Sequence, residues 1–252
     1  MAEGGGVMIW LYSGTPGSGK SFHALKDILV KVARKSHNKV IANFPVICGK
    51  HQDNFTYCDN TEITIEFLVN YARKNHKMGI ENQTLVVIDE AGTKFNCRDG
   101  FSGSTSKIRM EWLKFFSQHR KLGFNFILVA QSDKQLDKQI RLNIEYDVIH
   151  KKINNFFSFL PITVFLAVER WYGQKMKVGH QMIFFNKKLA KRYDSFAMFT
   201  DEFNIYGDVP TAGEALQNIE ISAAVKTPIK RKKKVNYFMK YLLPMVKFFI
   251  EV

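Results

Sequence analysis

Short apolar runs alternate with amphipathic segments along the chain up to residue 155. A continuous apolar run is typical of a strand in a parallel sheet covered on both faces, and apolar residues at spacings of three and four predict a helix. The pattern predicts strands at 7–12, 39–44, 84–88, 124–131 and 146–151, and helices at 22–30, 62–75 and 108–121. Because strands and helices alternate, we expect right-handed βαβ units and a mostly parallel sheet.

Beyond residue 155 the pattern changes, because two predicted strands follow each other without a helix between them. Residues 165–171 and 181–186 are typical of antiparallel strands, with glycines at the turns. We therefore expect a β-hairpin appended to the parallel core. Between the earlier elements, a polar loop is expected over 98–106, and Asn60 or Thr61 is expected to cap the helix that follows.

A glycine-rich segment of the form G-x-x-x-x-G-K-[ST] stands between the first predicted strand and the first predicted helix. Its residues are Gly14, Thr15, Pro16, Gly17, Ser18, Gly19, Lys20 and Ser21, followed by Phe22 in the helix. The glycines allow successive N–H groups to point at phosphate oxygens, and a helix N-terminus favours the anion further. Lys20 adds a charge for the β- and γ-phosphates, and the Ser21 hydroxyl is a ligand for Mg²⁺. Residues 14–22 therefore predict a site for ATP.

Two acidic residues, Asp89 and Glu90, directly follow the apolar run of 84–88. Ligands of α/β proteins bind where the strands end, so both carboxylates are expected beside the phosphates. We expect Asp89 to hold Mg²⁺ through water to Ser21, and Glu90 to orient and polarise the attacking water. The pair predicts an ATP hydrolase rather than simple binding. The alternative is that Asp89 only caps a following helix.

Two further polar residues are candidates for roles in catalysis. Gln131 ends a predicted strand, where its side chain could contact the γ-phosphate, and a hydrogen bond to loop backbone explains it equally well. Arg120 lies at the end of a predicted helix, where a basic residue interacts favourably with the helix dipole. The sharper hypothesis is that Arg120 reaches the γ-phosphate of a neighbouring subunit as an arginine finger. Arg98 and Arg109 are the alternatives for this role.

The chain is basic, with 37 Lys and Arg against 23 Asp and Glu among 252 residues, a formal net charge of +14. This balance favours a polyanion or an anionic membrane surface as a partner, although a basic surface can also serve solubility alone. The three cysteines are an odd number without a C-x-x-C pair, which is typical of a reducing cytoplasm.

Five consecutive positive charges at 230–234 precede an apolar segment at 237–252. In a helix, the large apolar residues of this segment share one face, and Lys240, Lys247 and Glu251 lie on the other. A basic amphipathic helix beside a polybasic cluster is typical of binding to an anionic membrane. The segment is shorter than the ~20 apolar residues of a complete span. A truncated span, an interfacial anchor and a protein without a domain beyond the membrane all remain open.

Four segments together resemble the zonular occludens toxin (Zot) family, which includes the assembly ATPase of filamentous phages. They are residues 13–21, 41–46, 86–91, and 119–123 leading to 130–131. The first and third occur in many ATPases, whereas the second and fourth, in this order and spacing, are more specific. The resemblance extends from about residue 7 to 153, and more weakly to about residue 186.

The resemblance implies a P-loop NTPase with a three-layer α/β sandwich and a mostly parallel sheet, to which the hairpin and a C-terminal amphipathic or membrane helix are added. The expected division is a flexible N-terminus at 1–6, an ATPase domain at 7–200, a linker with the polybasic cluster at 201–235, and a membrane-associated helix at 236–252.

The function that the resemblance implies is ATP-driven assembly and export of filamentous phage at the cytoplasmic face of the host's inner membrane. It also implies a ring-like homo-oligomer that acts on coat protein or single-stranded DNA, anchored to anionic lipid through residues 230–252. Two alternatives remain at this point: a soluble ATPase that translocates or packages DNA, and a membrane adaptor that binds ATP without turnover.

Overall fold

The computed structural model describes residues 8–96, 103–153, 163–174 and 176–193, with side chains from residue 107 in the second range. The segments expected at 1–6, 201–235 and 236–252 lie outside the described residues, and so does Arg98. Within the described ranges, no helix has both the length and the apolar character needed to cross a membrane.

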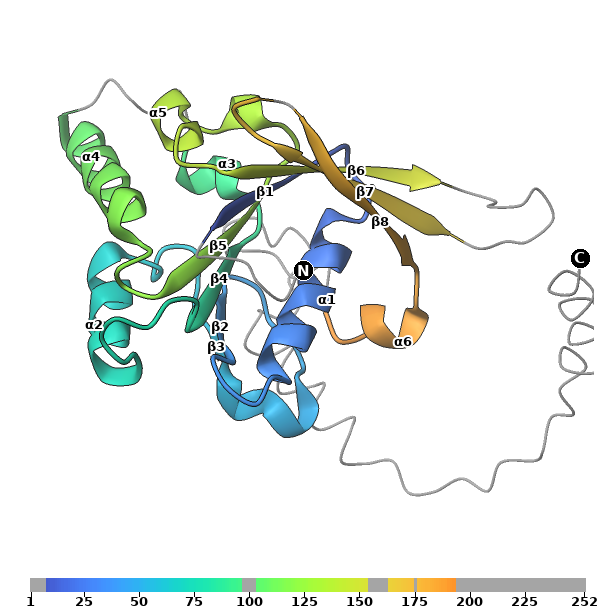
Figure 1. The fold of residues 1–252 in the computed structure, drawn as a ribbon, viewed down its shortest axis with the longest axis horizontal. Helices are drawn as coiled ribbons and strands as arrows, with labels where there is room; N and C mark the ends of the chain where they lie inside the picture. Colours follow the sequence, from blue (N-terminus) through green and yellow to red (C-terminus); the bar gives the residue numbers. More distant parts are fainter. Residues whose placement is uncertain (1–7, 97–102, 154–162, 175, 194–252) are drawn as a thin grey trace, which may run out of the picture. The chain divides into compact units, whose positions relative to one another are not determined.

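The order of elements follows the predicted alternation (Figure 1). The strands are β1 (Ile9–Ser13), β2 (Lys39–Ala42), β3 (Phe55–Tyr57), β4 (Thr84–Ile88), β5 (Phe124–Val129), β6 (Tyr146–Ile153), β7 (Val164–Trp171) and β8 (Lys177–Phe184). The α-helices are α1 (Lys20–Val32), α2 (Ile65–Asn75), α3 (Ala91–Lys94), α4 (Gly103–Gln118), α5 (Lys138–Arg141) and α6 (Lys187–Ala190). Two short 3₁₀ turns, Gly49–Asn54 and Asp133–Gln135, complete the described secondary structure.

The eight described strands form one mixed sheet in the order β3-β2-β4-β5-β1-β6-β7-β8. Every neighbouring pair from β3 to β6 is parallel, whereas β6, β7 and β8 pair antiparallel. β1 lies between β5 and β6, both of which come much later in the chain. The loop after β1 therefore lies near the middle of the sheet, between the ends of β5 and β6, and the predicted α/β class with a mostly parallel sheet is confirmed.

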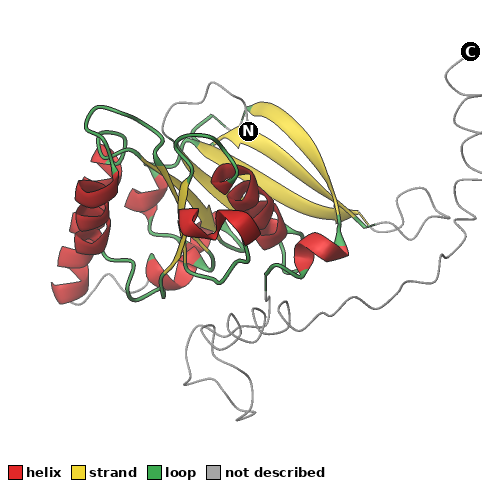
Figure 2. Ribbon diagram, turned by 90° about the horizontal axis from the view of Figure 1, so that it is seen from below, coloured by secondary structure: helices red, strands yellow, loops and turns green. Residues whose placement is uncertain are grey.

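Helices cover both faces of the parallel part of the sheet, as Figures 1 and 2 show. Alternate residues of one strand belong to different cores: Ile9 and Leu11 pack with α2 and α4, whereas Trp10 and Tyr12 pack with α1. A strand covered by helices on both faces is therefore apolar at most positions, because each of its residues faces one of two water-free layers. This explains why β4 and β5 are almost entirely apolar, since all of their residues are buried, including Thr84 and Asn125.

The structure corrects several boundaries predicted from sequence. α2 begins at Ile65, capped by Thr64 rather than by Asn60 or Thr61, because the Thr64 hydroxyl accepts a hydrogen bond from the backbone N–H of Phe67 at 3.1 Å. α4 begins at Gly103, inside the segment predicted as a polar loop over 98–106, since its Ser- and Thr-rich first turn carries no apolar periodicity.

The hairpin is confirmed, with longer arms than predicted, and it joins the main sheet through β6. After β8 the chain turns through α6, and its end returns to the loop that follows β2. Tyr193 forms a bridge with Val46, and the N–H of Ile47 donates to the carbonyl of Arg192 at 3.0 Å. The segment that follows the hairpin is thereby fixed beside the carboxyl ends of the central strands.

Candidate nucleotide-binding site

The loop from Gly14 to Ser21 connects β1 to α1 in a conformation that glycine makes possible. Gly14 and Gly19 have φ angles of +144° and +94°, in the region that L-residues with a side chain rarely occupy. A Cβ at Gly14 would lie 2.6 Å from the carbonyl oxygen of His150, and one at Gly19 would lie 2.4 Å from the ring of Phe165. Neither position has room for a side chain, so both the backbone path and its neighbours require glycine.

Two polar side chains of the loop are suited to receive phosphate. The Lys20 ammonium donates to the loop's own carbonyls, Gly14 O at 2.9 Å and Thr15 O at 3.1 Å, which holds the charge over the concave side of the loop. The Ser18 hydroxyl is buried and has no hydrogen-bond partner within the described part of the chain. A buried polar atom without a partner is costly unless a ligand supplies one. Both observations fit an anion in this cradle.

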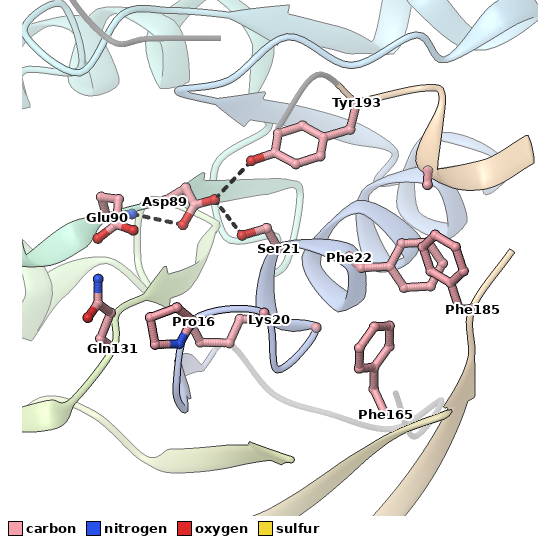
Figure 3. Close-up of a pocket in the computed structure, with 13 residues that line it drawn as sticks. Pro16, Lys20, Ser21, Phe22, Asp89, Glu90, Gln131, Phe165, Phe185 and Tyr193 are labelled. Carbon is pink, nitrogen blue, oxygen red and sulfur yellow. Dashed lines mark hydrogen bonds between the residues drawn. The ribbon is translucent and has the colours of Figure 1, made fainter. Parts of the chain in front are cut away.

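The Ser21 hydroxyl and the Asp89 carboxylate meet at the end of β4, as predicted for a Mg²⁺ site (Figure 3). Ser21 Oγ donates to Asp89 Oδ2 at 2.7 Å, and the hydroxyl of Tyr193 approaches the same oxygen at 3.4 Å. Three hard oxygen atoms at one point suit Mg²⁺, which takes oxygen ligands and commonly keeps several waters. The Ser21 hydroxyl and the Asp89 carboxylate therefore fit the ion, and the Tyr193 hydroxyl contacts the same carboxylate oxygen as Ser21.

The Asn43 side chain holds the backbone just after β4 in place by two hydrogen bonds to Asp89. Its amide donates to the Asp89 carbonyl at 2.9 Å, and its side-chain oxygen accepts from the Asp89 N–H at 2.7 Å. Asn43 is almost fully buried beyond the end of β2. The two bonds fix the direction in which the Asp89 side chain leaves the strand.

Glu90 has a strained backbone conformation, with φ +48° and ψ +45°. Its N–H donates to Asp89 Oδ1 at 2.9 Å, which supports this left-handed turn. Non-glycine residues in such a conformation cost of order 1–3 kcal/mol and are concentrated at functional sites. The turn places the Glu90 side chain in the same cleft as Asp89, facing Gln131 (Figure 3).

Burial shifts the ionisation of the three charged groups in the cleft. Burial raises the pKa of Asp89, while the hydrogen bond from Ser21 and the nearby Lys20 charge act in the opposite direction. Burial, followed by the negative charge of Asp89, raises the pKa of Glu90. Burial lowers the pKa of Lys20, and the two carboxylates counter that effect. A raised pKa makes the Glu90 carboxylate a better proton acceptor than a solvated one.

Gln131 lies where the sequence predicts it, at the end of β5 and in the wall of the cleft. Its carbonyl accepts from the N–H of Gly14 at 3.3 Å, and its N–H donates to Gln135 Oε1 at 3.1 Å. The backbone of Gln131 is therefore bonded to the phosphate-loop segment, while its side chain faces Glu90 (Figure 3).

Arg120 lies outside the cleft of its own chain. It stands between α4 and the start of β5, at the sheet edge opposite the loop, and its guanidinium pairs with the exposed carboxylate of Glu81 at 2.5 Å. Arg109 is also engaged, because it pairs with Asp137 at 3.3 Å. The structure thus brings Lys20, Ser21, Asp89, Glu90 and Gln131 together, and leaves Arg120 as a candidate only for a neighbouring subunit.

A cleft of about 480 Å³ joins these groups, and its two ends differ in chemistry. Lys20, Ser21, Asp89, Glu90 and Gln131 line one end, and Phe22, Phe165 and Phe185 line the other (Figure 3). Figure 3 shows the three phenylalanines gathered on the far side of the loop from Glu90. The volume is within the range of roughly 300–1,000 Å³ that is usual for sites of small ligands.

A buried cluster of polar side chains lies next to the phosphate loop, between β1, α1 and β6. His150 on β6 accepts or donates to His23 on α1 at 2.8 Å, and its other ring nitrogen lies 3.2 Å from the carbonyl of Ser13. The Tyr12 hydroxyl donates to Asp27 on α1 at 2.6 Å. These contacts join the strand before the loop to the helix after it, which fixes the loop at both ends.

Several residues of the site were not predicted from sequence. Asn43 belongs to one of the segments that carry the family resemblance, although a role in positioning Asp89 was not inferred from it. Phe165, Phe185 and Tyr193 come from the hairpin and the segment behind it, and no local pattern marks them as part of a cleft. Tyr193 lies 104 residues from Asp89 in sequence, so only the fold reveals their contact.

A phosphate loop after the first strand, an acidic pair at the end of a neighbouring strand and a covered, mostly parallel sheet define the class of P-loop NTPases. The family model described as "Zonular occludens toxin (Zot)" matches residues 8–198. The chain belongs to this family, and the resemblance stated from sequence is confirmed.

Two curated relatives carry the name Gene 1 protein. The one of Enterobacteria phage I2-2 is 27% identical over 153 residues, covering 57% of this chain and 40% of that protein. The one of Escherichia phage If1 is 26% identical over 153 residues, covering 57% of this chain and 41% of that protein. The matched part of the chain thus spans about two fifths of the length of these relatives.

Among solved structures, the N-terminal domain of zonular occludens toxin from Neisseria meningitidis is similar at 17% identity and a TM-score of 0.45, covering 75% of this chain and 100% of that one. The genome packaging NTPase B204 from Sulfolobus turreted icosahedral virus 2, in complex with ATP-gammaS, has 17% identity and a TM-score of 0.45, covering 70% and 96%.

Proposed function

We propose that this chain is a membrane-associated ATPase that powers the assembly and export of filamentous phage. One observation carries the catalytic part of the proposal: the phosphate loop, the Ser21–Asp89 pair and the strained Glu90 converge in a single cleft. Membership of the Zot family and the similarity to two phage Gene 1 proteins support a phage-related ATPase as the coarser function. Coat protein exchange on single-stranded DNA and action at the cytoplasmic face of the host's inner membrane are the finer parts of the proposal.

Each cleft residue has a separate role in the proposed reaction. The loop N–H groups and Lys20 bind the β- and γ-phosphates, for which the Lys20 ammonium exchanges its two carbonyl partners for phosphate oxygens. Glu90 accepts a proton from the attacking water, which its raised pKa favours. Gln131, on the other wall, orients that water or contacts the γ-phosphate.

Mg²⁺, held by Ser21 and Asp89, would neutralise charge on the phosphates and orient them for in-line attack. Asn43 acts through Asp89, since it fixes the backbone that carries this carboxylate. The Tyr193 hydroxyl, from the segment behind the hairpin, donates to the same Asp89 oxygen as Ser21 and helps to orient it. One further positive charge is needed beside the γ-phosphate. We propose that the guanidinium of Arg120 from a neighbouring subunit supplies it in a homo-oligomeric ring.

The proposed domain arrangement assigns residues 7–200 to the ATPase, 201–235 to a linker with the polybasic cluster, and 236–252 to a membrane-associated helix. The five charges of 230–234 would each add about 1 kcal/mol of attraction to an anionic leaflet, and the apolar face of 236–252 would insert beside them.

Steady-state hydrolysis of ATP by the purified 252-residue chain tests the proposal. The reaction is measured alone, with single-stranded DNA and with vesicles that contain anionic lipid, and Lys20→Ala is the blank. Stimulation by vesicles and not by DNA is the expected result. The matched control replaces the five basic residues of 230–234 by glutamine, which should remove the stimulation and leave the basal rate unchanged.

Stimulation by DNA alone would contradict the membrane role and favour a soluble ATPase that translocates or packages DNA. In that case the basic charge of the chain, +14, would serve to bind phosphates of the nucleic acid. A rate equal to that of Lys20→Ala under all conditions would contradict ATP hydrolysis itself.

A further inference from the structure

The apolar end of the nucleotide cleft is built by aromatic side chains that phosphate binding does not use. Phe22 follows Ser21 in the first turn of α1, Phe165 comes from β7, and Phe185 directly follows β8. Their rings form a cluster, with centroid distances of 5.9 Å between Phe22 and Phe165 and 5.4 Å between Phe22 and Phe185. Phe165 and Phe185 meet edge to face at 6.3 Å.

This cluster adjoins the phosphate loop directly. The ring of Phe165 occupies the space where a Cβ on Gly19 would be, so the loop and the cluster share a surface. Phe22 and Phe165 are buried, whereas Phe185 is 42% exposed and leaves one side of the cluster open. An exposed aromatic ring at the end of a cleft offers a flat apolar surface to a ligand that is anchored at the other end.

The chemistry of this end differs sharply from that of the phosphate end. Phe22, Phe165 and Phe185 line it, and none of these side chains can donate or accept a hydrogen bond. A nucleobase joined to a bound triphosphate matches such a surface, because every base has a π-face and stacks on aromatic rings with little dependence on its identity. Discrimination between two bases requires polar groups that read their edges.

We propose that Phe22, Phe165 and Phe185 form a stacking subsite that binds the base of a purine nucleoside triphosphate without distinguishing adenine from guanine. This inference rests on the proposed function, since it names the substrate class of the same cleft. Two of the three rings thus come from the hairpin and the residue that follows it, whereas the core supplies Phe22 and the phosphate site.

The subsite is tested by calorimetric titration of the 252-residue chain with ATP, GTP and inorganic tripolyphosphate. ATP and GTP are expected to bind within about threefold of each other, and both roughly tenfold or more above tripolyphosphate. Phe185→Ala is expected to weaken both nucleotides roughly tenfold and to leave tripolyphosphate unchanged. Phe185 is partly exposed, so the substitution removes little from the core.

Phe184→Ala is the matched control, because Phe184 is the neighbouring phenylalanine, is 58% exposed and is not part of the cleft. It should leave all three affinities unchanged. Three results would overturn the subsite: equal weakening of nucleotides and tripolyphosphate by Phe185→Ala, no effect on either, or a preference for one purine above about a hundredfold.

The failure of the subsite can be told from failure of the proposed function. If tripolyphosphate binds the wild type and not Lys20→Ala, and the base adds no affinity, the subsite is wrong and the phosphate site stands. If neither nucleotides nor tripolyphosphate bind in a manner that depends on Lys20, both proposals are wrong.

Discussion

At the scale of single residues, Glu90 is the position that separates binding from turnover. Glu90→Gln keeps the shape of the side chain and removes the proton acceptor. Because a positioned general base contributes about 10²- to 10⁴-fold to a rate, we expect ATP turnover to fall by that factor while nucleotide affinity changes little. Steady-state hydrolysis and calorimetric binding on the same preparation measure the two quantities.

Lys20→Ala is the control for Glu90→Gln, since it should lose affinity as well as turnover. The pH profile gives a second control. The base must be ionised, so the wild-type rate should decline as pH falls through the raised pKa of Glu90. A slow rate that Glu90→Gln leaves unaltered would instead indicate a nucleotide-gated adaptor.

Asn43 is the residue whose loss should affect both stability and the metal site. Asn43→Ala leaves the Asp89 N–H and carbonyl without their partners in a buried place. Burying an unsatisfied polar group costs roughly 1–3 kcal/mol, so the free energy of unfolding should fall by about that amount. Urea unfolding measures it, and the Mg²⁺ concentration needed for half-maximal turnover should rise in the same variant.

The control for Asn43 is Asn75→Ala, which removes one exposed hydrogen bond at the end of α2. Exposed substitutions of this kind usually change stability by less than about 0.5 kcal/mol. If Asn43→Ala and Asn75→Ala lower the stability equally, the two bonds to Asp89 have no special role.

At the scale of elements, the packing of α1 on β6 makes stability depend on pH. Burial lowers the pKa of His23 to about 4 and that of His150 to about 3. Both rings stay neutral in the folded chain, whereas the unfolded chain protonates them below about 6.5. Their contribution to stability is therefore present above pH 6.5 and is lost as the pH falls below it.

Asp27 acts in the opposite direction, because burial raises its pKa to about 6. Between pH 4 and 6 the folded chain holds a proton on Asp27 that the unfolded chain releases, so this contribution is lost as the pH rises. Two histidines against one carboxyl leave a net uptake of about one proton on unfolding, or ~1.4 kcal/mol of stability per pH unit.

Asp27→Asn removes the opposing group and keeps an acceptor for the Tyr12 hydroxyl. We expect its stability to decline more steeply than that of the wild type between pH 6 and 4, by a further ~1.4 kcal/mol per unit. Urea unfolding at several pH values compares the two proteins. Equal slopes would show that Asp27 is ionised in the folded chain throughout this range.

The elements also show how far the sequence predicts this molecule. Five of the six parallel strands, β1, β2, β4, β5 and β6, coincide with strands predicted from sequence. β3 has only three residues, too few for a periodic signal, and was not predicted. The phosphate loop and the acidic pair are local in sequence. The aromatic end of the cleft is not, because Phe165 meets Gly19 only once β7 has paired with β6.

At the scale of the whole molecule, the position of Arg120 bears on how subunits would cooperate. Parallel strands bring their carboxyl ends to the phosphate loop, and Arg120 precedes β5 at the amino end. A side chain there cannot reach the loop of its own chain across the length of the sheet. It is exposed and pairs with Glu81 at the surface, where a neighbouring subunit in a ring could receive it.

Mixing two inactive variants tests this proposal. Lys20→Ala lacks a working phosphate loop and keeps Arg120, and Arg120→Ala lacks the arginine and keeps the loop. If each site takes Arg120 from its neighbour, one site in four of an equal random mixture is complete, so about a quarter of wild-type turnover should return.

Arg73→Ala, a substitution at an arginine on the surface of α2, is the control and should be active without mixing. An Arg120→Ala chain that is fully active alone, or a mixture that stays inactive, would exclude Arg120 as the shared residue. Recovery would show that hydrolysis requires two subunits, which is the coupling that an assembly motor needs.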